Sequence, residues 1–267
     1  MAWGGPDESE QRRPVKGLWR RSTALSLLLA GLALAAYAGF SMIGTAVSSH
    51  ALIILGIVPR NGFLQGAALT LFVTASAGIL ALVGASILAW LRSTGHMVPI
   101  VLVASIVSFG RGTPLLLQLF IFYFALPELG LVLSPLQAGI AALAYCYSAY
   151  GSEIIRSSMQ AVPRNTLDAA RALGLSKFKR FQTVHFPLAI RYAAVPMGNL
   201  VIALVKDTSL VSVIGVWDMM MIARIYGARD LSYLHMLVAV GIVYWIISAL
   251  LEIGVDGLEQ RLSRYPD

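Results

Sequence analysis

The chain has 267 residues, of which 58% are hydrophobic and 12% charged, and its mean hydropathy is +0.76. Soluble domains contain about 25% charged residues on average, so this composition excludes an ordinary soluble protein and indicates an integral membrane protein. The net charge of +7 does not indicate nucleic-acid binding, because the basic residues stand at the ends of apolar blocks, where they set orientation.

The first apolar block, residues 23–43, predicts a transmembrane helix. A basic start and an apolar run also fit a cleaved secretory signal, but the block is longer than the roughly 7 to 15 residues of a typical signal core. We assign residues 1–62 to a cytoplasmic basic N-terminus, this first helix and an external loop. The basic residues before the block are Arg12, Arg13, Lys16, Arg20 and Arg21.

The next predicted spans are residues 63–91, 113–127 and 135–152. Residues 98–110 are apolar too, but the glycines and the proline that follow predict a separate helix or a kink there. We expect Arg111, Thr113 and Pro114 to form this helix break near the cytoplasmic side, with the Arg111 guanidinium holding carbonyls that the break frees. Direct contact of Arg111 with a solute is the alternative.

A long loop, residues 153–187, separates the fourth and fifth spans and carries helical signals. Its basic residues place it in the cytoplasm. Asn165 and Asp168 predict a capping box that opens a helix at 166–173, and Gly174 is expected to end it. Ser176 is expected to cap a second helix, at about 177–184, before Pro187 enters the next span.

The last two predicted spans are residues 190–212 and 234–254. Lys206 and Asp207 lie deep in the first of them, where a lone charge costs at least about 2.5 kcal/mol. Two interpretations stay open. The pair faces a solute path, with hydrogen bonds added by Thr208 and Ser209, or it is a neutralising pair with a structural role between helices.

The loop resembles the EAA loop of binding-protein-dependent ABC transporter permeases. The matching residues keep the spacing of that motif, although Asp replaces the usual Glu, Val the Ile and Phe the Leu. Residues 111–116 and 206–215 are similar to the polar amino acid branch of the same permeases. The residues of the loop that carry the resemblance are Asp168, Ala169, Ala170, Gly174, Val184, His185, Phe186 and Pro187.

The resemblance implies an all-α integral membrane fold of the type I ABC importer permease kind, with about six transmembrane helices. Residues 63–260 would form the transmembrane domain, and the loop at 153–187 would couple it to a separate ATPase. The implied partners are a second permease subunit, two ABC ATPase subunits, an extracytoplasmic solute-binding protein and membrane lipid. The implied location is the bacterial inner membrane, with both termini in the cytoplasm.

The sequence contains no phosphate-binding loop, no cluster with metal-ligand spacing and no nucleophile with a base. We therefore expect no enzymatic activity and no cofactor in this chain, with ATP and Mg²⁺ bound by the partner ATPase. An ion-coupled secondary transporter of small solutes is the alternative function. Such proteins use carboxylates within the membrane, and Asp207 is the one acidic residue well inside a predicted span.

Overall fold

The computed structural model describes residues 62–94, 96–229 and 231–262, and every regular element in these ranges is helical. The predicted first span, at residues 23–43, lies outside the described residues. The elements are α3 (Phe63–Ser93), α4 (Met97–Gly112), α5 (Leu115–Phe120), η1 (Ile121–Ala125), η2 (Leu126–Leu129), α6 (Pro135–Ala161), α7 (Arg164–Ala172), α8 (Lys177–Arg180), η3 (Phe181–His185), α9 (Phe186–Asp207), η4 (Thr208–Ile214), α10 (Met219–Arg229) and α11 (Tyr233–Leu262).

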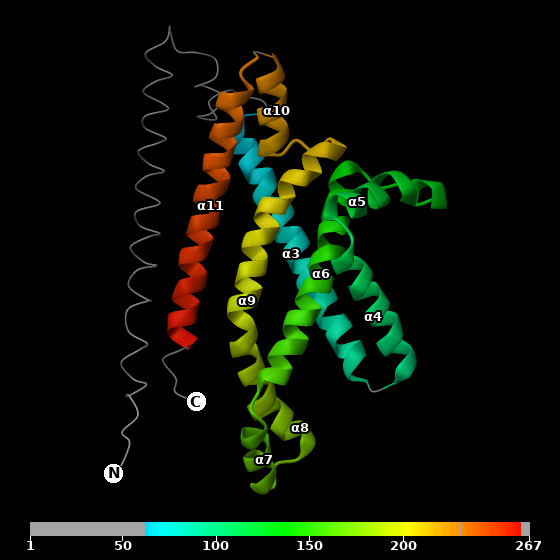
Figure 1. The fold of residues 1–267 in the computed structure, drawn as a ribbon, viewed down its shortest axis with the longest axis vertical. Helices are drawn as coiled ribbons and strands as arrows, with labels where there is room; N and C mark the ends of the chain where they lie inside the picture. The colour runs from blue at the N-terminus through cyan, green and yellow to red at the C-terminus, as the bar shows by residue number, and fades with distance from the viewer. Residues whose placement is uncertain (1–61, 95, 230, 263–267) are drawn as a thin grey trace, which may run out of the picture.

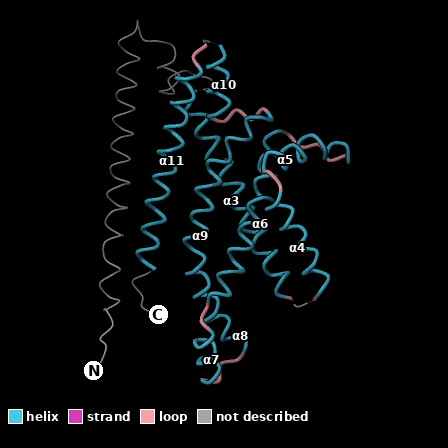
Figure 2. Tube along the Cα trace, in the orientation of Figure 1, coloured by secondary structure: helices cyan, strands magenta, loops and turns pink. Residues whose placement is uncertain are grey.

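Helices α3, α6, α9 and α11 run along the length of the molecule, with α7 and α8 at one end and α10 at the other (Figures 1 and 2). Helix α6 packs against both α3 and α9, and α9 packs against α11. Small residues allow the close approach of α3 and α6: a Cβ added to Gly151 would stand 3.0 Å from the Cβ of Ala85. Contact through small residues is typical of helix pairs in membranes.

Three helical units are long and apolar enough to cross a membrane, judged by length and composition: α3, the continuous unit Lys177–Ile214, and α11. The 31 residues of α3 correspond to about 46 Å at about 1.5 Å per residue. Large apolar side chains such as Leu80 and Leu250 point outward from this bundle, as expected for a surface in contact with lipid. These units confirm the apolar helices predicted to begin near residues 63, 190 and 234.

The third predicted span, residues 113–127, corresponds to the helical unit Leu115–Leu129, but this unit does not form a straight span of its own. The apolar segment at 98–110 is the separate helix α4, and the chain bends by 109° between α4 and the unit Leu115–Leu129. This unit leaves α4 sideways, near the end of the molecule that carries α10 (Figure 1). Helix α4 and the unit after it are therefore a broken span or a re-entrant loop.

The side chain of Gln118 stabilises this bend. It is fully buried, and its Nε2 donates hydrogen bonds to the carbonyl oxygens of Gly110 (2.8 Å) and Thr113 (3.1 Å). The expectation that Arg111 holds the freed carbonyls is therefore wrong. Side chains in a helix point back toward its N-terminus, so Gln118 in the turn after Pro114 reaches into the bend, whereas the Arg111 side chain is 46% exposed.

The loop at 153–187 forms the two predicted helices, with one correction at the start of the first. Helix α7 begins at Arg164 with no side-chain cap, so the capping box predicted from Asn165 is wrong. Gly174 ends the first helix in the left-handed conformation (φ 77°), which glycine adopts without strain. Ser176 caps α8, as predicted. The second helix then continues through η3 into α9, because Pro187 falls in the first turn of α9, where proline is tolerated.

Candidate functional site

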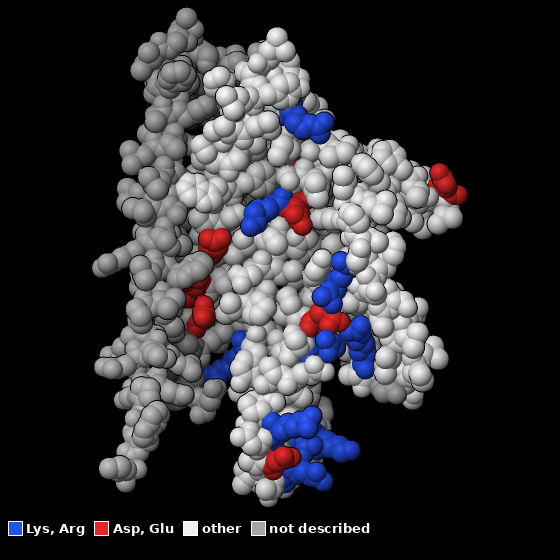
Figure 3. All heavy atoms as spheres, in the orientation of Figure 1, with Lys and Arg blue, Asp and Glu red and all other residues white. Residues whose placement is uncertain are grey.

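The tip of the loop at 153–187 exposes apolar side chains among basic ones. Leu173 is 81% exposed and Phe178 is 73% exposed. Asp168, Ala169 and Gly174 are also exposed, whereas Ala170 is buried within the loop. Figure 3 shows the blue side chains gathered at this end of the molecule. The tip thus combines strongly exposed apolar side chains with basic ones, a composition that suits an interaction site. Its exposed basic residues are Arg164, Arg171, Lys177 and Lys179.

The second half of the loop motif holds the loop to the bundle. His185 Nε2 donates a hydrogen bond of 2.9 Å to the carbonyl oxygen of Met159, near the end of α6. Val184 is half-buried next to it, and Pro187 is exposed at the start of α9. The loop is therefore attached to α6 through this hydrogen bond and to α9 through the continuous helical chain.

Lys206 and Asp207 end helix α9, but they do not neutralise each other. The Tyr147 hydroxyl of α6 donates a hydrogen bond of 2.8 Å to Asp207 Oδ2. Lys206 is exposed, and it forms no ion pair with any residue that the structure describes. The structure therefore contains an exposed lysine next to an anchored carboxylate in the unit that is long enough to cross the membrane.

Thr208 and Ser209, which follow the charged pair, differ in their burial. Thr208 is fully buried, and its hydroxyl donates to the Val205 carbonyl oxygen (2.6 Å). Ser209 is half-buried and donates to the Lys206 carbonyl oxygen (2.7 Å). Both hydroxyls satisfy the backbone at the change from α9 to the 3₁₀ helix η4. Thr208 thus belongs to the core, and Ser209 alone of the two lies near the exposed lysine.

A second charged group surrounds Glu153 of α6. Arg92 donates to Glu153 Oε1, and Arg156 donates to Oε2 through Nε (2.9 Å) and Nη2 (2.8 Å). Arg111 Nη1 lies 3.9 Å from Oε2, and its Cζ lies 5.7 Å from the centre of the Tyr150 ring. We expected Arg111 near a membrane edge, but Gly110 beside it lies against Ala149, close to the middle of α6.

A buried carboxylate that was not predicted from the sequence, Asp218, lies between η4 and α10. It is fully buried, Oδ1 accepts from the Met221 amide (2.9 Å), and Oδ2 accepts from the Tyr244 hydroxyl of α11 (3.2 Å). Burial raises the pKa of Asp218 to about 6. An aspartate just before a helical segment is a helix-capping signal, so the residue could have been found from its position.

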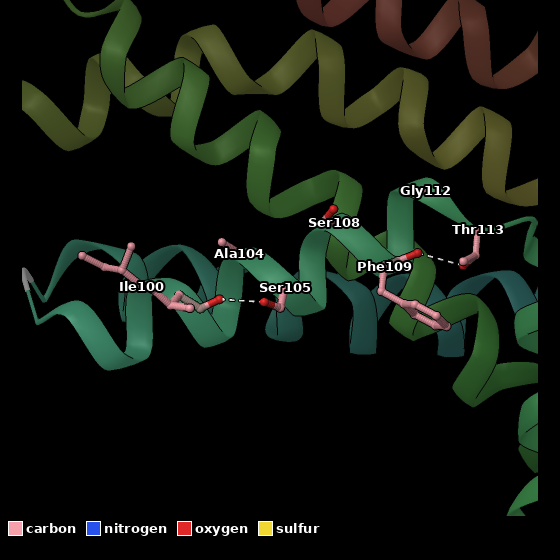
Figure 4. Close-up of a pocket in the computed structure, with 8 residues that line it drawn as sticks. Ile100, Ala104, Ser105, Ser108, Phe109, Gly112 and Thr113 are labelled. Atoms are coloured by element: carbon pink, nitrogen blue, oxygen red, sulfur yellow. Dashed lines mark hydrogen bonds between the residues drawn. The ribbon is translucent and has the colours of Figure 1, made fainter.

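A shallow hollow runs along the exposed side of α4 (Figure 4). Its floor is low because Ala104, Ser108 and Gly112 are small and recur every fourth residue. The hydroxyls of Ser105 and Thr113 bond carbonyls of their own helix, at 3.1 Å and 2.8 Å. The hollow is therefore suited by shape to the close packing of another helix rather than to a polar solute.

Comparison with known proteins places the chain in a family. The family model of the inner membrane component of binding-protein-dependent transport systems matches residues 101–264. A probable amino-acid permease protein of Bacillus subtilis (strain 168), YxeN, is 35% identical over 206 residues, which are 75% of this chain and 91% of the relative. The arginine transport system permease protein ArtQ of the same organism is 33% identical over 209 residues, which are 77% of this chain and 95% of that relative.

Solved structures show the same fold. The crystal structure of an amino acid ABC transporter with histidines matches with a TM-score of 0.74 at 28% identity, over 81% of this chain and 100% of the other. The inward-facing methionine ABC transporter MetNI matches with a TM-score of 0.61 at 19% identity, over 75% and 95%, and supports the fold alone. The type I importer permease fold is thus confirmed. Because the family match covers more than half of its length, this chain belongs to the inner membrane components of binding-protein-dependent transport systems.

Proposed function

We propose that the chain is the permease subunit of an ATP-driven importer and forms half of the translocation path for amino acids or related polar solutes. The names of its relatives support this cargo, since YxeN is a probable amino-acid permease and ArtQ an arginine permease. Family membership disfavours the ion-coupled secondary transporter. The observation that carries the proposal is the exposed tip of the cytoplasmic loop, because a transport subunit without its own ATPase needs a docking surface for one.

The tip, residues 164–180, binds a separate ABC ATPase in this proposal. Leu173 and Phe178 would be buried on docking, and full burial of each side chain contributes about 1.5 to 3 kcal/mol. Ala169 leaves room for close approach, and Gly174 supplies the tight turn. The ATPase binds ATP and Mg²⁺, so this chain needs no cofactor. A symmetric importer uses two such ATPase subunits, one below each permease.

A second permease subunit, either a copy of this chain or a relative, completes the path. Lys206 supports this pairing, because an exposed lysine within a spanning helix costs about 2.5 to 3.5 kcal/mol if it faces lipid. A partner subunit and a water-filled path between the two would remove that cost. Asp207 would then bind the ammonium group of the solute and Lys206 its carboxylate.

The subunit lies in the bacterial inner membrane with the loop tip and both chain termini in the cytoplasm. The basic residues of the tip support this orientation. An extracytoplasmic solute-binding protein delivers solute to the opposite end, where α10 and the unit Leu115–Leu129 lie (Figure 1). The mechanism needs lipid and protein partners only, and no nucleic acid.

Replacement of Gly174 by leucine tests the docking surface. Gly174 has φ 77°, so a side chain there strains the turn, while no heavy atom lies near its Cβ position. Gly130→Leu is a matched control, because Gly130 has φ 83° and equally open surroundings but belongs to the loop after η2. We expect Gly174→Leu to insert normally and to lose copurification with the ATPase, while Gly130→Leu retains it. Equal copurification of both variants would contradict the docking assignment.

A further inference from the structure

Arg111 lies on the exposed side of the bundle with its guanidinium almost unused. Its side chain is 46% exposed and stacks over Tyr150, with Cζ 5.7 Å from the ring centre. Arg111 Nη1 lies 3.9 Å from Glu153 Oε2, which is too far for a hydrogen bond. No described residue accepts a hydrogen bond from this guanidinium, so its donors are available to a ligand.

The group around Glu153 carries a net positive charge, because three arginines lie near this one carboxylate. Arg92 occupies Oε1 of the carboxylate and Arg156 occupies Oε2, so both oxygens already have close cationic partners. Arg111 is the third arginine near a single carboxylate. Three positive charges near one negative charge attract an anion, above all where the surroundings are partly apolar and screening is weak.

The helix break does not need Arg111 either. Gln118 holds the carbonyl oxygens that the break at Pro114 frees, with Nε2 2.8 Å from the Gly110 oxygen and 3.1 Å from the Thr113 oxygen. The local structural role expected for the arginine is thus filled by a buried amide. A charged side chain within a membrane segment is costly, so one that does not hold the freed carbonyl oxygens indicates a functional site.

Arg111 is also connected to Asp207 through a series of side-chain contacts along α6. The Tyr147 hydroxyl binds Asp207, the rings of Tyr147 and Tyr150 have centres 6.5 Å apart, and Arg111 stacks over Tyr150. These contacts progress along α6 toward its Ala161 end, from which the chain enters the cytoplasmic loop. Figure 3 shows charged side chains over α9 and a second charged group over α4 and α6 on the same face of the molecule.

We propose that Arg111 is an anion-binding position that takes the carboxylate of the transported solute after it leaves Asp207 on its way to the cytoplasm. The inference rests on the proposed import of amino acids. A guanidinium suits this role because it binds a carboxylate through two parallel hydrogen bonds. The two positions act in succession rather than together, since two tyrosine rings separate them.

The chemistry that Arg111 recognises is an oxyanion, and a lipid phosphate could supply one as well as a solute carboxylate. The test therefore uses the whole complex of permease, ATPase and binding protein in vesicles of two compositions. One is phosphatidylcholine alone, and the other adds phosphatidylglycerol. The probes are radiolabelled L-amino acids, supplied singly with the binding protein and with ATP at the ATPase side.

The test variant is Arg111→Gln, and Arg261→Gln is its matched control. Arg261 is an exposed arginine in the last turn of α11, outside the group around Glu153 and outside the proposed docking and path residues. We expect Arg111→Gln to lower uptake at least about tenfold, as for a lost hydrogen bond to a charged group. The amount of complex and the stimulation of its ATPase by loaded binding protein should match the wild type. Arg261→Gln should keep uptake close to the wild type.

Two other outcomes for Arg111→Gln overturn the inference, and a failure to assemble calls for a second variant. Normal uptake by Arg111→Gln shows that no solute carboxylate binds there. A defect that appears only with phosphatidylglycerol assigns the site to lipid. If Arg111→Gln fails to assemble, the test uses Arg111→Lys, which keeps the positive charge but cannot form the bidentate hydrogen bonds of a guanidinium. Reduced uptake by Arg111→Lys supports the inference, and normal uptake overturns it. A wild-type complex that imports no amino acid overturns both this inference and the proposed function.

Discussion

The Tyr147 hydroxyl donates a hydrogen bond of 2.8 Å to Asp207 Oδ2, and this bond joins α6 to the last residue of α9. Tyr147 is only 4% exposed, whereas Asp207 is half-buried. No described residue donates to the other carboxylate oxygen of Asp207. One oxygen is therefore anchored in the core while the other stays available, which is the arrangement needed to bind an ammonium group without reorganisation.

Asp207→Asn tests this role in the solute path. We expect the variant to assemble and to keep the ATPase response to the loaded binding protein at least in part, but to lose most uptake, because a neutral amide cannot pair with an ammonium group. The control is Tyr147→Phe, which removes the hydrogen bond but keeps the charge. It should cost about 0.5 to 1.5 kcal/mol of stability and retain more uptake than Asp207→Asn.

A structural role for Asp207 gives a different result. In that case Asp207→Asn lowers the amount of assembled complex, and uptake falls only in proportion to it. Assembly is followed by size-exclusion chromatography and uptake by accumulation of labelled solute. Normal uptake together with normal assembly would rule out both roles.

Gln118→Leu tests the stabilisation of the bend after α4. The substitution preserves volume but leaves the carbonyl oxygens of Gly110 and Thr113 without their donor. A buried group left unpaired costs about 1 to 3 kcal/mol. We expect a lower unfolding temperature of the complex in a thermal shift measurement. Gln160→Leu is the control, because Gln160 is exposed on α6, and an equal effect of both variants would contradict the role of Gln118.

Much of the loop at 153–187 could be predicted from sequence, because its signals are local. Gly174 ends a helix and Ser176 begins one through contacts with their own neighbours. The bend after α4 could not be predicted in its angle. A glutamine in an apolar run, such as Gln118, gives no periodic signal, and its partners are set by how the chain turns at Pro114.

The residues proposed to line the solute path could also be predicted only in part. Lys206 and Asp207 were correctly located in an apolar helical unit, because charges in such a unit are conspicuous in the sequence. The burial of Thr208 could not be foreseen. It depends on the change from α-helix to 3₁₀ helix at that residue, which alters the side that each later side chain faces.

Asp218→Asn tests the buried capping carboxylate through pH. Burial raises the pKa of Asp218 from its ordinary value of 3.8 to about 6, so the folded protein retains this proton over a range in which the unfolded chain has released it. The stabilising contribution of this group is therefore present at low pH and is lost as pH rises through about 6. We expect the unfolding temperature of the wild type to fall relative to that of the variant across this range. Parallel pH profiles would show that Asp218 is not the titrating group.

Single cysteines test the orientation in the membrane. In a Cys146→Ala background, a cysteine replacing Glu128 should react with an impermeant reagent added outside, because Glu128 is exposed in η2, away from the loop tip. A cysteine replacing Lys179 in the tip should react only after permeabilisation. The reverse pattern would place the loop outside and remove the site proposed for the ATPase.

In the proposed function, this permease moves amino acids by using ATP that a partner subunit hydrolyses. The most direct test is uptake of labelled amino acids into vesicles that contain the purified permease–ATPase complex, with the binding protein on the other side of the membrane from ATP. We predict uptake that requires both ATP and the binding protein and persists when ionophores collapse the ion gradients. Uptake that continues without ATP and stops with the ionophores would contradict the claim and favour an ion-coupled transporter.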